Sequence, residues 1–269
     1  MTQLAFLKLG GSLITNKAVP HTPRLGPISR LCIEIAAALA EDPKIRLVVG
    51  HGSGSFGHIP ARVFKTREGV YNQNQWRGFV EVWQEAAGLN HIIMQGFHHA
   101  GLLAMAFPAS ASMVASGRKV LSWEIAPLIQ ALNAGLLPVI YGDVIFDREQ
   151  GGTIFSTEDL FYYLAQQLKP QRMLLAGLEA GVWKDFPLRK NLIKMITPKN
   201  AVEVYPSLGE SVFVDVTGGM AGKVGAMLKL VEEVPDLEVV IFSGETPGLV
   251  KDVLLGNQAG TRIRNSIVV

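Results

Sequence analysis

The sequence predicts an α/β fold in which helices cover both faces of a mostly parallel sheet, so that the molecule has three layers and two lobes. Short apolar runs of strand length alternate with longer stretches of helical periodicity along the whole chain, a pattern typical of parallel sheets. Three of these runs, at 4–9, 45–50 and 136–141, stop at or just before a glycine turn. Neither a linker nor an internal repeat divides the 269 residues, so we expect a single domain.

The elements of the first half follow from apolar spacing and from the positions of glycine and proline. Apolar residues recur at helical spacing over 27–39, and Pro27 suits the first turn of that helix. The expected order is a strand at 4–9, a helix at 27–39, a strand at 45–50, an irregular polar segment at 62–75, and two helical stretches within 76–106 that break near Gly88 and Gly101.

The second half continues the same alternation. Gly135 is placed to end one helix, and Ser156 with Asp159 three positions later forms a capping-box pattern that opens another. The expected order is a short strand at 109–114, a helix at 123–133, a strand at 136–141, a hairpin turn at 151–152, a helix opened by 156–159, a strand at 172–176, a loop or hairpin at 177–196, a run at 212–216 that leads into a helix, a strand at 238–243, a helix from 246 and a last strand near 263–268.

Composition and charge exclude several classes of protein. Apolar residues make up 48% of the chain and charged residues 18%, which indicates a well-packed globule rather than disorder. The net charge is only +2 and no basic run occurs, so we expect no nucleic-acid partner. The lone Cys32 excludes an internal disulfide. No apolar stretch is long enough to span a membrane, and Lys8 with the following glycines interrupts the apolar start; we therefore expect a cytoplasmic protein without a secretory signal.

A glycine-rich loop follows the second strand. Residues 47–58 read LVVGHGSGSFGH, with glycine at every second or third position and His58 at the end. Glycines at this density let main-chain N–H groups converge on one point, which suits a phosphate group. A tight strand-to-helix turn is the plainer alternative. The spacing of Gly52, Gly54 and Gly57 also fits the dinucleotide fingerprint, but that motif needs a carboxylate about 20 positions later, and residues 71–77 contain none.

Lysines occur beside the other turns. Lys8 precedes Gly10 and Gly11 at the end of the first strand, Lys17 follows shortly after, and Lys223 lies in the first turn of a predicted helix, where a cation opposes the helix dipole. Taken alone, Lys17 is more typical of a solvated loop charge than of a ligand-binding residue. Because the ends of parallel strands share one edge of a sheet, we expect these cations and His58 to gather there. So much positive charge suits two phosphorylated ligands and hence phosphoryl transfer, although the sequence contains no P-loop motif.

The motifs together resemble the amino acid kinase superfamily, and within it the isopentenyl phosphate kinases. They occur in the family's order along the whole chain, as KLGGS at 8–12, GSGSFGH at 52–58, GDV at 142–144, STED at 156–159 and DVTGGM at 215–220 followed by Lys223. The chain departs from the family at 178–183, which reads LEAGVW and lacks both aspartates of the usual DVDGVY run. It also has Thr157 where the family has a glycine near the acceptor.

The resemblance implies transfer of the ATP γ-phosphoryl group to isopentenyl phosphate, with Mg²⁺, by a homodimer. Residues 1–165 would form the acceptor-binding lobe and 166–269 the nucleotide-binding lobe. His58 would bind the acceptor phosphate, Lys17 would bridge phosphates in the transition state, and Asp159 would orient Lys8 and Lys223; by sequence alone, Asp159 could equally be only a capping residue. The other residues implied are Gly52 and Thr157 at the acceptor, and Gly10, Gly11, Ser12, Ser53, Gly54, Gly218 and Gly219 with Lys8 and Lys223 at the nucleotide.

The apolar helices at 76–107 carry more bulky side chains than one helical face hides. They are compatible with core plus an oligomer interface, or with an apolar pocket for the acceptor's tail. We interpret His91, His98 and His99 as structural or exposed rather than as metal ligands, because no carboxylate or cysteine partner accompanies them. The alternative functions are a kinase of another small phosphate or phosphonate, as in fosfomycin kinases; kinases of carboxylates, carbamate or nucleoside monophosphates; a non-catalytic nucleotide sensor; and a dinucleotide oxidoreductase.

Overall fold

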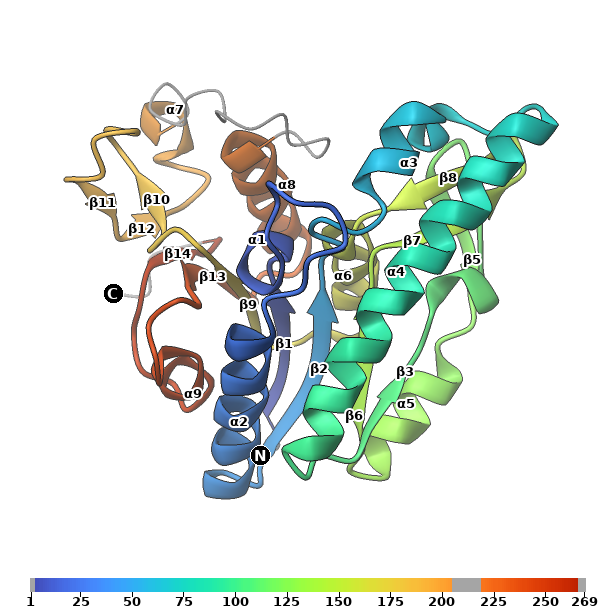
Figure 1. Cartoon of the computed structure of the whole chain (residues 1–269). Coiled ribbons are helices and arrows are strands. Elements are labelled where there is room, and N and C mark those ends of the chain that lie inside the picture. The colour runs from blue at the N-terminus through green and yellow to red at the C-terminus, as the bar shows by residue number, and fades with distance from the viewer. Residues whose placement is uncertain (1–2, 205–218, 266–269) are drawn as a thin grey trace.

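The computed structural model describes residues 3–204 and 219–265, and its centre is an eight-stranded sheet with the strand order β12-β14-β13-β9-β1-β2-β6-β3 (Figure 1). All neighbours in this sheet are parallel except β13 and β14, which confirms the prediction of a mostly parallel sheet. The strands are β1 (Gln3–Leu9), β2 (Ile45–His51), β3 (Ala104–Ala106), β6 (Leu137–Tyr141), β9 (Arg172–Gly177), β12 (Met195–Ile196), β13 (Glu238–Ser243) and β14 (Thr261–Ile263).

Helices cover both faces, as expected, and β1 shows how the sequence produces this. Its alternate residues Leu7 and Leu9 join one apolar cluster while Phe6 joins the other, because successive side chains of a strand point to opposite faces. Figure 1 shows α2 and α4 in front of the sheet. The first cluster packs under α2 (Leu25–Glu41), α4 (Gln73–His99) and α9 (Leu249–Leu254), and the second under α5 (Ala126–Asn133), α6 (Thr157–Leu168) and α8 (Gly219–Glu233).

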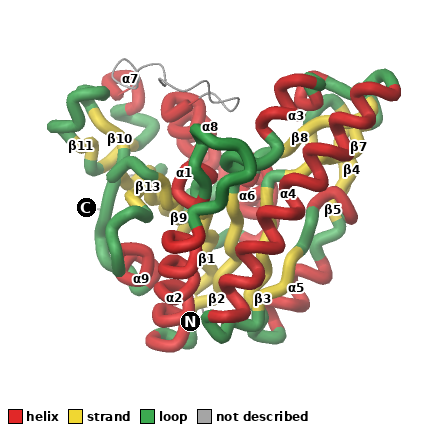
Figure 2. Tube along the Cα trace, in the orientation of Figure 1, coloured by secondary structure: helices red, strands yellow, loops and turns green. Residues whose placement is uncertain are grey.

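Two smaller sheets flank the carboxyl edge of the large one (Figure 2). A four-stranded sheet of order β5-β4-β7-β8 comes from the first half of the chain, and a two-stranded one, β10-β11, from the second. The remaining elements are α1 (Gly11–Ile14), α3 (His58–Val63), β4 (Met113–Ser116), β5 (Lys119–Trp123), β7 (Asp143–Asp147), β8 (Gly151–Phe155), β10 (Val182–Trp183), β11 (Leu192–Ile193), α7 (Ala201–Val204) and the 3₁₀ turns η1 (Thr66–Glu68) and η2 (Ala109–Ala111).

Several predicted boundaries are wrong. The stretch 76–106 is one continuous helix to His99, without a break at Gly88, because a glycine costs a helix only about 1 kcal/mol and the packing of α4 on the sheet outweighs it. The segment 62–75 contains the end of α3, η1 and the start of α4. A 3₁₀ turn occupies the start of 109–114, and Trp123 ends β5 instead of opening a helix.

The C-terminal boundaries also differ. The helix predicted from 246 begins at Leu249, after Gly248 in a left-handed conformation. The last strand ends at Ile263, and part of the predicted range, together with the run at 212–216, lies outside the described residues. In the part of the chain that the structure describes, no helix is long and apolar enough to cross a membrane.

Candidate functional site

A cavity of about 630 Å³ opens at the carboxyl edge of the large sheet, where β1, β2 and β9 end side by side. The turns after β1 and β2 and the start of α6 all contribute to its wall. Every predicted site residue that the structure describes lines this cavity except Asp159; these are Lys8, Gly10, Gly11, Ser12, Lys17, Gly52, Ser53, Gly54, His58, Thr157, Gly219 and Lys223. Gly218 lies outside the described residues.

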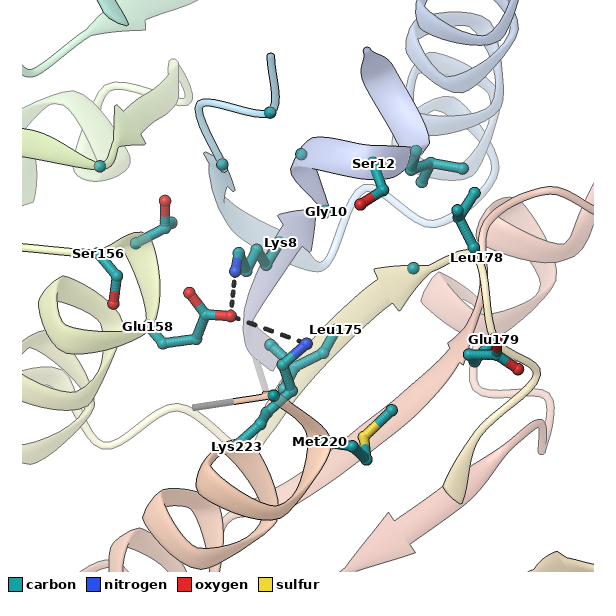
Figure 3. Close-up of a pocket in the computed structure, with 18 of the residues that line it drawn as sticks. Lys8, Gly10, Ser12, Ser156, Glu158, Leu175, Leu178, Glu179, Met220 and Lys223 are labelled. Atoms are coloured by element: carbon teal, nitrogen blue, oxygen red, sulfur yellow. Dashed lines mark ion pairs between the residues drawn. The ribbon is translucent and has the colours of Figure 1, made fainter. Parts of the chain in front are cut away.

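Glu158 holds the two lysines that the sequence places far apart. Its Oε1 atom contacts Lys8 Nζ and lies 3.9 Å from Lys223 Nζ (Figure 3). Burial alone would raise the pKa of Glu158, but the charges of both lysines and the hydrogen bond from Lys8 hold it below its usual value. Sequence reasoning did not single out Glu158. It reaches the lysines because Lys8 comes from the central strand and Lys223 from α8, which packs beside α6.

The prediction that Asp159 orients the lysines is therefore corrected by the geometry. Asp159 Oδ2 accepts hydrogen bonds from Ser156 N (2.8 Å) and Ser156 Oγ (2.7 Å), while its own N–H donates to Ser156 Oγ at 3.1 Å. This is a complete capping box at the start of α6. The third helical position turns its side chain back to the cap, whereas Glu158, one position earlier, faces the cavity.

The two glycine turns approach each other backbone to backbone. A Cβ atom on Gly11 would lie 2.5 Å from Gly54 N, and one on Gly54 would lie 2.6 Å from Gly11 O. Gly54 also has a φ of +56°, a conformation that disfavours side chains. Gly52 N–H donates to Leu9 O at 3.0 Å. Only glycine allows these contacts, and they place the main chain of both turns on the wall of one cavity.

His58 is the first residue of α3, after Gly57 in a left-handed conformation. It shares its side of the cavity with the apolar side chains of Ala61, Val82 and Ile154. Of the residues of α4, only Val82 lines the cavity, and Leu89 and Phe97 are among those buried against the sheet. The apolar side chains of α4 therefore belong mostly to the core. Of the pocket that the sequence predicts along this helix, α4 supplies one lining side chain, that of Val82.

Thr157 and His51 are hydrogen-bonded to each other beneath the glycine loop. Thr157 Oγ1 donates to the main-chain oxygen of His51 at 2.6 Å, so its hydroxyl is already engaged. The His51 ring is fully buried, stacks on Tyr141 and donates a hydrogen bond from Nε2 to Asn90 Oδ1 at 3.2 Å. Burial lowers the pKa of His51 to about 4, so the ring is uncharged at neutral pH and adds no cation beside Lys8.

Another part of the cavity wall is aromatic and comes from the second half of the chain. Glu179 accepts hydrogen bonds from Trp183 Nε1 (2.9 Å) and Arg189 Nη2 (2.8 Å), and the Arg189 guanidinium lies 5.0 Å from the centre of the Phe186 ring. The hydrogen bond from Arg189 is the main reason that the pKa of Glu179 is lowered. This is the run that lacks the family's aspartates, and no sequence pattern indicated the contact between Glu179 and Arg189.

Two histidines of α4 contact groups close to them along the chain. His98 Nε2 lies 3.0 Å from Ala104 O, and His91 Nε2 lies 3.2 Å from Gln95 Nε2. Within residues 3–204 and 219–265, no group of three or more His, Cys, Asp or Glu side chains is arranged to hold a metal ion. Cys32 is buried beneath α4, beside Gly96.

Comparison with known proteins agrees with this geometry. The amino acid kinase family model matches residues 3–243. Isopentenyl phosphate kinase of Methanocaldococcus jannaschii is 31% identical over 97% of this chain and 98% of its own length, and that of Haloferax volcanii is 32% identical over 92% and 98%. A solved isopentenyl phosphate kinase covers 97% of this chain and 99% of its own, with 26% identity and a TM-score of 0.81. The chain belongs to the amino acid kinase family.

Proposed function

We propose that this chain transfers the γ-phosphoryl group of ATP to isopentenyl phosphate, giving isopentenyl diphosphate and ADP. The observation that carries the proposal is the pair of lysines around Glu158, in the same cavity wall as the two glycine turns. Relatives matched over nearly the whole chain are isopentenyl phosphate kinases. An apolar wall beside His58 suits an isoprenoid tail next to a phosphate head group.

The reaction needs cations more than it needs a base. The acceptor is a phosphate monoester, whose second pKa of about 6 leaves it mostly dianionic at neutral pH. Its oxygen is already a nucleophile, and the main barrier is repulsion between two anions. Lys8 and Lys223 neutralise the transferring group and Lys17 bridges the phosphates, while His58 donates a hydrogen bond to the acceptor phosphate. Glu158 keeps the two lysines close together before the phosphates arrive.

The main chain of the two glycine turns suits the phosphate groups of ATP. Gly11 and Gly54 lie where an added Cβ would meet the backbone of the other glycine turn, and we expect their amides to approach phosphate oxygens closely. The Gly10 N–H already donates to Ala176 O at 2.8 Å, so Gly10 serves the site by its small size. Mg²⁺ would bind together with ATP and would supply further neutralisation of the phosphate charge. Among the described residues, the carboxylates that line the cavity are Glu158 and Glu179, and both are paired with cations. We therefore expect ATP oxygens and water, rather than these side chains, to hold the ion.

The two halves of the chain divide the substrates between them. Residues 1–165 supply His58 and the apolar wall, which we assign to the acceptor, and 166–269 supply Trp183, Phe186 and Arg189, which we assign to the nucleotide. A homodimer and a cytoplasmic location belong to the same proposal. Val80 and Trp83 on α4 are 54% and 44% exposed, which supports an interface along that helix.

The proposal is tested by ADP release with isopentenyl phosphate, dimethylallyl phosphate, fosfomycin and uridylate as acceptors. We expect turnover with isopentenyl phosphate at the highest kcat/KM and formation of isopentenyl diphosphate in the product mixture. A higher kcat/KM for fosfomycin or uridylate would reassign the acceptor. Tight ATP binding without turnover of any acceptor would indicate a nucleotide sensor instead.

A further inference from the structure

Lys17 lies on a closed loop between α1 and α2, residues 16–23, which we call the Lys17 loop. Asn16 N–H donates to Thr22 O at 2.9 Å, and Thr15 and Pro23 form an isolated β-bridge, so the loop is closed at its base. Lys17 is exposed and lines the cavity. Apart from its closed base, the position of the Lys17 loop depends on what its C-terminal arm contacts.

The C-terminal arm of the Lys17 loop contacts the glycine turn that presents His58, residues 52–58, which we call the His58 loop. His21 N–H donates to Ser55 O at 3.3 Å, and Thr22 N–H donates to Ser55 Oγ at 3.2 Å. The His21 ring packs edge-on against Phe56, with ring centres 5.5 Å apart. The two loops that carry Lys17 and His58 are therefore joined to each other.

Glu85, from the middle of α4, contacts both loops with one carboxylate. Its Oε2 atom accepts a hydrogen bond from Gly57 N, directly before His58, and its Oε1 atom lies 3.5 Å from His21 Nε2. The Glu85 side chain is only 20% exposed, whereas that of His21 is 54% exposed. Glu85 does not line the cavity, so it reaches the reaction only through the two loops.

A negative charge behind an anion site needs a reason, because it weakens the attraction for the acceptor phosphate. Here the carboxylate accepts a main-chain N–H, and a charged acceptor makes a stronger hydrogen bond than a neutral one. We propose that Glu85 is a positioning residue that fixes the Lys17 loop and the His58 loop in one arrangement for the acceptor phosphate. The inference rests on the proposed function, since it takes His58 and Lys17 as the acceptor-side cations.

Kinetics of three variants separate the two contacts. Glu85→Ala loses both, and we expect kcat/KM for isopentenyl phosphate to fall by about 10- to 100-fold, the cost of a misplacement of about 1 Å, with the KM for ATP unchanged. Glu85→Gln keeps an acceptor for Gly57 N–H and loses the charge facing His21, so its loss is smaller. His21→Ala removes the contact with Glu85 and the ring packing on Phe56 but keeps the main-chain bonds to Ser55, so we expect it to loosen only the Lys17 loop and to lower kcat more than it raises the acceptor KM.

The matched control is Glu81→Ala, one turn earlier on α4. The Glu81 side chain is 44% exposed and pairs only with Arg77, at 3.7 Å, on the same helix, so its loss leaves both loops in place. Equal kinetics for Glu85→Ala and Glu81→Ala would overturn the proposal. An equal rise in the KM values for ATP and acceptor in Glu85→Ala would do the same, because it would indicate a general loss of structure.

Hydrogen exchange gives a readout that does not depend on turnover. In Glu85→Ala we expect faster exchange in both loops, in His21→Ala faster exchange in residues 16–23, and in Glu81→Ala neither change. If the wild-type protein turns over no acceptor, the proposed function fails, yet the exchange data still decide whether Glu85 holds the loops. If Glu85→Ala does not fold, Glu85→Gln and His21→Ala carry the test, and unchanged exchange and kinetics in both would refute the proposal.

Discussion

The carboxylate between Lys8 and Lys223 gives the sharpest prediction. In Glu158→Gln the side chain keeps its size and loses its charge, so the two ammonium groups face each other without a counter-charge. Both contact the same oxygen of Glu158 in the native protein, and the Lys8 and Lys223 side chains are only 11% and 30% exposed. We expect the substrate-free variant to be less stable and the nucleotide to restore much of the loss.

The magnitude follows from the geometry. Two unit charges roughly 5 to 6 Å apart repel each other by about 3 kcal/mol at an effective dielectric constant of about 20. Because the cavity admits water around Lys223, we expect a loss of about 1 to 3 kcal/mol in the free energy of unfolding. For a chain of this size, each kcal/mol corresponds to roughly 2 to 4 °C in Tm. The expected decrease is therefore about 4 to 8 °C for a loss of about 2 kcal/mol.

Differential scanning calorimetry with and without ATP measures both effects. Phosphate oxygens replace the missing carboxylate charge, so ATP should raise the Tm of Glu158→Gln by several degrees more than that of the wild type. The control is Asp159→Asn, which weakens the capping box and costs about 1 kcal/mol without touching either lysine. Its ATP-induced shift should equal the wild-type shift. The reasoning is refuted if the two variants respond to ATP alike.

The pH dependence has a definite sign. The pKa of Glu158 is lowered in the folded protein, so its contribution to stability is present above the unfolded-state value of about 4.3 and is lost as the pH falls. The Tm difference between the wild type and Glu158→Gln should thus be largest near neutral pH and should close in acid. A difference that stays constant down to strongly acidic pH would mean that the charge of Glu158 is not its source.

Three further predictions concern the lysine, the histidine and the glycine turn. Lys223→Ala should abolish phosphoryl transfer while the protein still unfolds in one cooperative transition, and retained turnover would remove Lys223 from the mechanism. His58→Ala should lower kcat/KM for the acceptor far more than it weakens ATP binding measured by calorimetric titration; equal losses would place His58 on the wrong substrate. Gly54→Ala should lower the free energy of unfolding by about 1 to 3 kcal/mol, because its φ is +56° and the added Cβ would lie 2.6 Å from Gly11 O. As a contrast, Gly88→Ala has no atom within 4 Å of the added Cβ and should raise the free energy of unfolding by about 0.5 to 1 kcal/mol. Denaturant titrations measure both changes.

The position of the site could be predicted because it depends on strand ends. Strands 4–9, 45–50 and 136–141 are apolar runs that stop at or just before glycine, and in the structure β1, β2 and β6 are parallel neighbours. Their loops must then share one edge. The capping box at 156–159 could also be predicted, and in the structure Asp159 bonds the cap and does not line the cavity.

Other features depend on contacts that leave no local pattern. Glu85 contacts Gly57, 28 positions away along the chain, and nothing in its helical spacing separates it from Glu81, whose partner is Arg77 on the same helix. The continuity of α4 through Gly88 depends on the sheet beneath it rather than on helix propensity. Such features follow from which surfaces meet in three dimensions, and one sequence does not specify that.

The place of β1 in the middle of the large sheet has a consequence for how the protein can be divided. β1 pairs with β2 on one side and with β9 on the other. A cut of the chain between α6 and β9 would therefore leave one edge of β1 and one edge of β9 without a hydrogen-bonded partner strand. Each fragment would expose an unpaired apolar edge and tend to aggregate alone. Lys8 and Lys223 would lie on different fragments, so activity in a mixture would report reassembly directly, as in a split reporter.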